Sequence, residues 1–137
     1  ARLEGIRARS HMIIALDTVE FLKRGGRAGK VMPILDRVVR ALSIKPLLRV
    51  FGGELQVTGV ARSMTKAVRK ITEEFVGLAP ARMLAVAHTR RPDEAAAWAE
   101  ALAPQVGVAL SETLVVEAGP ALSAHAGPGV MAAAMVA

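Results

Sequence analysis

Residues 47–61 carry the sequence Leu47-Leu48-Arg49-Val50-Phe51-Gly52-Gly53-Glu54, continued by Leu55 to Ala61. This stretch decides the fold, because two apolar arms that flank a Gly-Gly pair are typical of a β-hairpin with a tight turn. Ile44-Lys45-Pro46 leads into the first arm and places proline near the strand start, where its missing N–H does least harm. A hairpin is an antiparallel pair, so the sequence excludes a purely parallel sheet.

Predicted strands and helices alternate around the hairpin. Residues 2–9 resemble the tail of a helix, and residues 121–137 leave helix and strand both open. The chain is therefore predicted to form an α/β (α+β) domain with a mixed or largely antiparallel sheet flanked by helices. Apolar runs and amphipathic stripes predict, in order, strand 11–16, helix 19–24, helix 31–42, the hairpin, helix 63–76, strand 81–88, helix 92–103 and a strand within 106–116.

The length and composition indicate one domain with a well-supplied core. The chain has 137 residues, 53% of them hydrophobic, and no cysteine. A disulfide framework and thiolate zinc sites are thereby excluded. The N-terminal residues lack the apolar region of a signal peptide, and the most apolar stretch, 130–137, is far shorter than the ~20 residues of a membrane span. These features predict a cytoplasmic protein without a transmembrane segment.

Positive charge is concentrated in the first part of the chain. The net charge is +6, and 16 of the 18 Lys and Arg residues lie within residues 1–82. The asymmetry favours either an anionic partner or a solvated basic face. Nucleic acid is not predicted as a partner, because there are only three Phe, one Trp and no readable motif.

Catalytic and metal-binding patterns are missing from the sequence. His11, His88 and His125 are far apart, and neither an H-E-x-x-H motif nor a G-x-S-x-G elbow occurs. The acidic residues are scattered and are most simply solvated helix positions. The sequence therefore predicts no enzyme activity, no catalytic residue and no metal site.

Two glycine-rich segments are the candidate ligand-binding elements. In the first, Lys23 to Lys30, three residues rather than four separate Gly25 from Gly29-Lys30, so it does not match a phosphate-binding loop. Its cations and backbone N–H groups suit either an anion or a helix C-terminus. In the second, Ser123 to Gly129, His125 has few bulky neighbours and can either donate to a carboxylate or serve a structural role.

Four ordered motifs lie within residues 10–137. They are Asp17 to Arg27, Ile44-Lys45-Pro46, Val60 to Ala67, and Glu117 to Pro120 followed by His125 to Gly129. In this order they form a strand, helix and Gly-Gly-Arg element, an Ile-Lys-Pro hairpin, a basic helix start and a closing Gly-Pro…His-x-Gly-Pro-Gly signature. Together the four motifs resemble those of the DegV family of lipid-binding proteins.

The resemblance is to the C-terminal domain of the family. It implies that residues 1–9 are the tail of an interdomain helix, that residues 10–137 form the lipid-binding domain, and that the N-terminal α/β domain is missing from the chain. The family binds a long-chain fatty acid between its two domains and presents the carboxylate to a separate fatty-acid kinase for phospholipid synthesis. This chain is then expected to contribute half of such a site.

The resemblance also implies roles for individual residues. His125 would hydrogen-bond the carboxylate, Arg27 would supply positive charge near it, and Gly127 and Gly129 would also belong to the fatty-acid-binding site. Arg62 and Lys66 would contact the kinase. The bound ligand would be a long-chain fatty acid with no other cofactor; the alternative is a structural or protein-interaction domain that binds no lipid.

Overall fold

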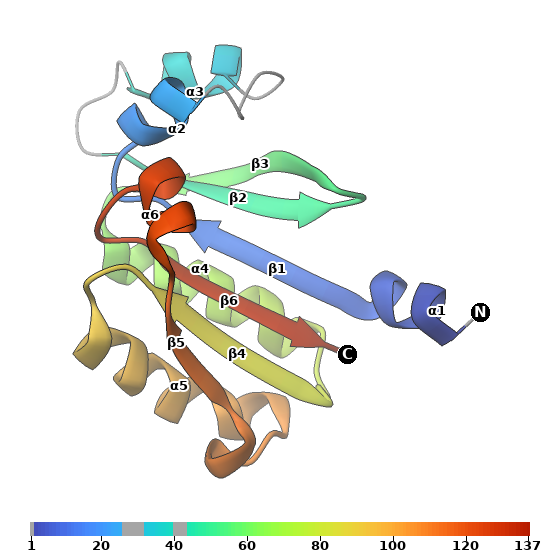
Figure 1. Cartoon of the computed structure of the whole chain (residues 1–137). Coiled ribbons are helices and arrows are strands. Elements are labelled where there is room, and N and C mark those ends of the chain that lie inside the picture. The colour runs from blue at the N-terminus through green and yellow to red at the C-terminus, as the bar shows by residue number, and fades with distance from the viewer. Residues whose placement is uncertain (1, 26–31, 40–43) are drawn as a thin grey trace.

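Helices cover both faces of one six-stranded sheet in the computed structural model (Figure 1). The structure describes residues 2–25, 32–39 and 44–137. In chain order its elements are α1 (Arg2–Arg9), β1 (Ser10–Ala15), α2 (Glu20–Gly25), α3 (Met32–Val39), β2 (Lys45–Phe51), β3 (Glu54–Ala61), α4 (Met64–Gly77), β4 (Met83–His88), α5 (Pro92–Val106), the 3-10 helix η1 (Leu110–Glu112), β5 (Leu114–Glu117), α6 (Pro120–Ala126) and β6 (Met131–Val136).

The sheet has the strand order β3-β2-β1-β6-β4-β5. Every neighbouring pair is antiparallel except β4 and β5, which are parallel. The predicted fold class, a mixed and largely antiparallel sheet flanked by helices, is confirmed. The last strand, β6, lies between β1 and β4, so the C-terminal segment forms the centre of the sheet.

The predicted hairpin is formed by β2 and β3. Its two-residue turn consists of Gly52 and Gly53, which both have positive φ, at 59° and 81°. Two positive φ angles match the right-handed twist of the strands and are accessible to glycine at little cost. A register shift between Leu47 and Leu48 places a bulge in the half of the hairpin that lies away from the turn.

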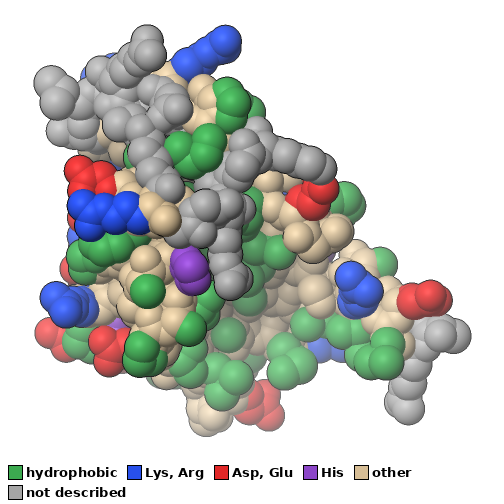
Figure 2. Space-filling view, turned by 45° about the horizontal axis from the view of Figure 1, so that its top comes forward, with side chains coloured by type: hydrophobic (Ala, Val, Ile, Leu, Met, Phe, Trp, Pro, Cys, Tyr) green, Lys and Arg blue, Asp and Glu red, His purple; other side chains and the backbone are tan. Residues whose placement is uncertain are grey.

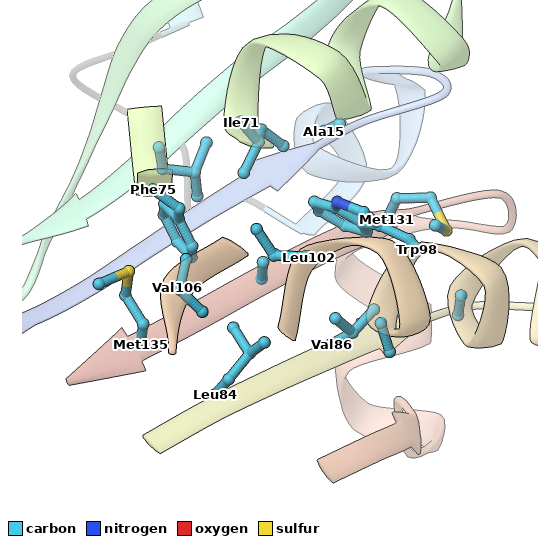
Figure 3. Packing of buried hydrophobic residues seen from close by; sticks show 14 of the residues in the cluster. Ala15, Ile71, Phe75, Leu84, Val86, Trp98, Leu102, Val106, Met131 and Met135 are labelled. Carbon is cyan, nitrogen blue, oxygen red and sulfur yellow. The ribbon is translucent and has the colours of Figure 1, made fainter. Parts of the chain in front are cut away.

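The main core lies between the sheet and the helices α4 and α5. Figure 3 shows side chains of these helices meeting those of β4 and β6, with Trp98 and Phe75 at its two ends. A smaller cluster on the other face joins α2 to the sheet through Leu16, Leu22 and Val130. The two faces of the sheet are therefore covered unequally, by two long helices on one side and by short ones on the other (Figure 1).

Local signals correctly predicted the helix that follows the hairpin. Ser63 caps α4, because its side chain accepts a hydrogen bond of 3.2 Å from the Lys66 N–H. Pro92 lies in the first turn of α5, and Gly107 ends that helix in the left-handed conformation.

Two parts of the element prediction needed correction or completion. The strand predicted within 106–116 is wrong for residues 106–113: α5 continues to Val106, whose side chain is buried, and a 3-10 turn follows before β5. Residues 121–137, left open by the sequence, form most of α6 and all of β6. Of the helix predicted over 31–42, the structure describes Met32–Val39 as helical, and the remaining residues lie outside the described part.

Candidate ligand-binding site

His125 lies in the last turn of the short helix α6 and is half-buried. The helix ends at Gly127, whose N–H donates to the Ser123 carbonyl over 2.9 Å. The His125 Nδ1 atom is buried and has no hydrogen-bond partner within the described part of the chain. A buried polar atom without a partner is costly, so this nitrogen is available to a ligand or to water.

The two glycines after His125 are held against neighbouring side chains. Gly127 has φ 81° and ψ 179°, and a Cβ there would lie 2.5 Å from Cδ2 of Phe21. Gly129 has φ 80°, and a Cβ there would lie 3.1 Å from the Cβ atom of Asp17. Both positions combine a backbone suited to glycine with a close approach from α2 or from the loop before it. The loop 127–129 is therefore tightly packed on that side.

Thr89 also holds the loop. Its side chain is 2% exposed and follows directly after β4. The Thr89 hydroxyl donates to the Gly127 carbonyl over 2.7 Å and accepts from the Val130 N–H over 2.9 Å. Its backbone N–H donates to the Val130 carbonyl, and its carbonyl accepts from the Gly129 N–H. All three polar groups of this one residue thus bind residues 127–130, through four hydrogen bonds.

An ion-pair network surrounds the same loop. Asp17 pairs with Lys45 at 2.8 Å and with Arg91 at 3.6 Å, and Arg91 also forms hydrogen bonds of 2.8 and 2.9 Å with Glu94. These residues come from the ends of β1 and β4, the start of β2 and the start of α5. The network joins four elements next to Gly129, at the end of the sheet where the central strand β6 begins.

Two of the other residues predicted to take part in binding, Arg62 and Lys66, lie away from this loop. Arg27 is outside the described residues. Arg62 and Lys66 are exposed and lie at the start of α4, which covers the opposite face of the sheet from α6 (Figure 1). His125, Gly127 and Gly129 form one compact loop, and Arg62 and Lys66, which the sequence predicted to contact a kinase, lie apart from it.

An apolar groove opens at the other end of the same strands. Its volume is about 680 Å³, and it does not include the His125 loop. Figure 2 shows hydrophobic side chains gathered on this side of the molecule, between the α6 region and α1. The groove is lined by residues from α1, β1, the β2–β3 turn, β4, β5 and β6, among them Arg7, Met12, Phe51, Met83, Leu114 and Val136.

The remaining histidines do not join His125. The Nδ1 atom of buried His88 accepts a hydrogen bond of 3.1 Å from the Arg91 N–H, and His11 lines the groove. Within residues 2–25, 32–39 and 44–137, no group of three or more His, Asp or Glu side chains is placed to hold a metal ion. In the same ranges, no helix combines the length and apolar character needed to span a bilayer.

Sequence reasoning identified the glycine loop but missed its supports. Thr89 stands directly after a strand with no motif around it, and Phe21 reads as an ordinary apolar helix residue. The carboxylate of Asp17 binds Lys45 and Arg91, and nothing in the sequence around Asp17 indicates these partners. These three residues meet the loop only through the tertiary fold.

Comparison with known proteins shows the family of this chain. The family model described as "Uncharacterised protein, DegV family" matches residues 1–137. A DegV domain-containing protein of Streptomyces coelicolor is 35% identical over 119 residues, which are 85% of this chain and 41% of the relative. The chain belongs to the DegV family.

Solved structures agree with this assignment. A structure named for the fatty acid binding of a DegV family protein from Thermus thermophilus is 30% identical, with a TM-score of 0.76 over 99% of this chain and 48% of that one. A stearic acid-binding protein from Eubacterium ventriosum, 17% identical, shares the fold with a TM-score of 0.80 over 98% of this chain and 47% of that one. The chain thus spans less than half the length of each of these relatives.

Proposed function

We propose that this chain contributes half of a fatty-acid-binding site and presents the acyl carboxylate to a separate fatty-acid kinase. The chain itself would carry out no chemistry. The observation that carries the proposal is the buried Nδ1 atom of His125, which has no partner within the described residues and lies beside a rigid glycine loop. Family membership and the fatty acids named for the Thermus and Eubacterium proteins support the same ligand.

The imidazole of His125 suits a carboxylate chemically. A ring N–H donates to a carboxylate oxygen, and a hydrogen bond to a charged group contributes about 1.5–3 kcal/mol where water is excluded. The glycines that follow carry no side chains, which lets the loop pack closely against Phe21 and Asp17 and holds the end of α6 in place. Arg27, which follows the last residue of α2 by two positions in the sequence, is proposed to add positive charge to this head-group site.

The acyl chain would contribute most of the binding free energy. Each buried methylene contributes about 0.8 kcal/mol, before the entropy losses of binding are subtracted. The apolar groove is lined by the second half of β6 and lies toward the far end of β1, β4 and β6 from His125. Because β6 has six residues, the far end of the groove is roughly one strand length, about 17 Å, from the start of β6. That separation is comparable to an extended long-chain fatty acid, so we propose that the tail points along the open sheet face toward the groove.

The rest of the site would come from outside this chain. More than half of each compared relative has no counterpart here. We propose that an upstream α/β domain packs over the groove, because Arg7 and Ala8 of α1 already line it. Such a domain would cover exposed apolar side chains that include Met83 and Leu114.

A kinase contact is proposed at the start of α4. Arg62 and Lys66 are exposed there, Arg62 directly before the N-cap Ser63 and Lys66 in the first turn of the helix. They would meet an acidic surface of the kinase in the cytoplasm. If no fatty acid binds, the alternative function is that of a protein-interaction domain without lipid binding.

The experiment separates binding from kinase coupling. In the two-domain protein, His125→Ala and Arg27→Ala should weaken retention of a long-chain fatty acid, measured by native mass spectrometry and by titration. Arg62→Glu, the matched control, should retain the fatty acid but slow its phosphorylation by the kinase in the presence of ATP. Reversal of this pattern would overturn the assigned roles.

A further inference from the structure

We propose that Thr89 is the positioning residue that aims His125 at the ligand's carboxylate. The inference rests on the proposed function, because it assigns Thr89 a task within the same binding site. Thr89 is 38 residues from Gly127 in sequence and belongs to a different element, yet it is the residue that fixes the end of α6.

The hydroxyl of Thr89 has no freedom to rotate. Its single hydrogen is donated to the Gly127 carbonyl, and its oxygen accepts from the Val130 N–H. A hydroxyl has one hydrogen to donate, so both bonds together determine its orientation. With the side chain 2% exposed, water cannot replace either bond without opening the loop.

The position of Gly127 in turn determines that of His125. Gly127 caps α6, and His125 lies two residues before it in the last helical turn. Phe21 packs against Gly127 and Asp17 against Gly129. The loop is thus held both by these side chains and by Thr89, and loss of the Thr89 hydrogen bonds would allow the end of α6 to shift.

The hydroxyl can be removed with little change of shape. Thr89→Val keeps the branched side chain but leaves the Gly127 carbonyl and the Val130 N–H buried without their side-chain partner. Thr89→Ser keeps both hydrogen bonds and serves as the conservative variant. Thr72→Val is the matched control, because the Thr72 hydroxyl also donates once, to Val68, and accepts once, from Trp98, on the opposite face of the sheet.

The measurement is the ratio of affinities for a fatty acid and for the fatty alcohol of equal chain length. A hydrogen bond from a well-placed His125 to the carboxylate raises the affinity for the acid and therefore this ratio. A loss of folded protein lowers both affinities by the same factor and therefore leaves the ratio unchanged. Thr89→Val should lower the ratio by about tenfold in the two-domain protein. Thr89→Ser and Thr72→Val should leave it unchanged, and a ratio unmoved in Thr89→Val would overturn the proposal.

A second readout needs no ligand and separates this proposal from the proposed function. Long-range ¹H–¹⁵N NMR spectra report the environment of the His125 ring nitrogens. Thr89→Val should shift these signals. In Thr89→Ser and Thr72→Val the signals should stay at their wild-type positions. If the wild-type protein shows no preference for the fatty acid over the fatty alcohol, the proposed function fails. The NMR signals still decide whether Thr89 positions His125. Signals that do not shift in Thr89→Val would refute that role.

Discussion

Gly127→Ala is expected to be far more destabilising than an ordinary glycine substitution. The backbone at Gly127 has φ 81° and ψ 179°, a combination that is essentially restricted to glycine. An added Cβ would also lie 2.5 Å from one carbon of the Phe21 ring and 3.0 Å from two others. Two separate penalties, one in the backbone and one in packing, therefore apply at the same residue.

The structure allows each penalty to be assigned a magnitude. Backbone strain of this kind costs about 1–3 kcal/mol, and overpacking of an already filled site costs about 1–3 kcal/mol. The loss is thus expected to be about 2–6 kcal/mol, a large fraction of the roughly 5–15 kcal/mol stability of a typical domain. Because Phe21 is half-buried, its ring can move partly away, which favours the lower half of this range.

Gly107→Ala is the matched control. Gly107 also has φ 81°, but its ψ of 22° is in the left-handed helical region, and an added Cβ would meet only Pro80 at an ordinary 3.8 Å. Its expected cost is about 1–2 kcal/mol, from the backbone alone. Urea denaturation of both variants measures the two costs on one scale.

A double-variant cycle isolates the packing penalty. Phe21→Ala removes the ring that the new Cβ would meet, so Gly127→Ala should cost less in the Phe21→Ala background than in wild type. The backbone strain should remain in both backgrounds. An equal cost in the two backgrounds, or a Gly127→Ala cost no larger than that of Gly107→Ala, would refute the reasoning.

Two further substitutions test the core. Phe75→Ala removes a fully buried ring and should lower the unfolding free energy by about 3–5 kcal/mol, whereas Val76→Ala, at an exposed neighbour, should change it by about 0.5 kcal/mol or less; denaturant unfolding distinguishes the two. Trp98→Phe removes the indole N–H that donates to the Thr72 hydroxyl over 2.9 Å, and thermal unfolding should report a loss of about 0.5–1.5 kcal/mol for that bond, in addition to any change in packing. An unchanged melting temperature would contradict the second expectation.

The hairpin was predictable because its signals are local. The Gly52-Gly53 pair lies between two apolar arms, and turn geometry follows from the residues in the turn itself. The cap at Ser63 was predictable for the same reason. Boundaries were missed where packing overrides local preference: α5 continues through Pro104 because Leu102, Ala103 and Val106 are buried against the sheet.

The centre of the sheet was not predictable from the sequence. Met131–Val136 is an alanine-rich run that reads equally well as helix or strand, and its strand form depends on pairing with β1 and β4, more than 40 residues away. The candidate site divides in the same way. The glycine loop stands out by composition, whereas Thr89 becomes visible only when the sheet brings the end of β4 against it.

The most direct test of carboxylate binding at the His125 loop is native mass spectrometry of the two-domain protein purified from cells. We expect one long-chain fatty acid per protein in the wild type and a strongly reduced adduct in His125→Ala. Protein that neither carries a fatty acid on purification nor takes one up on titration would contradict the central claim. An undiminished adduct in His125→Ala would instead place the carboxylate elsewhere.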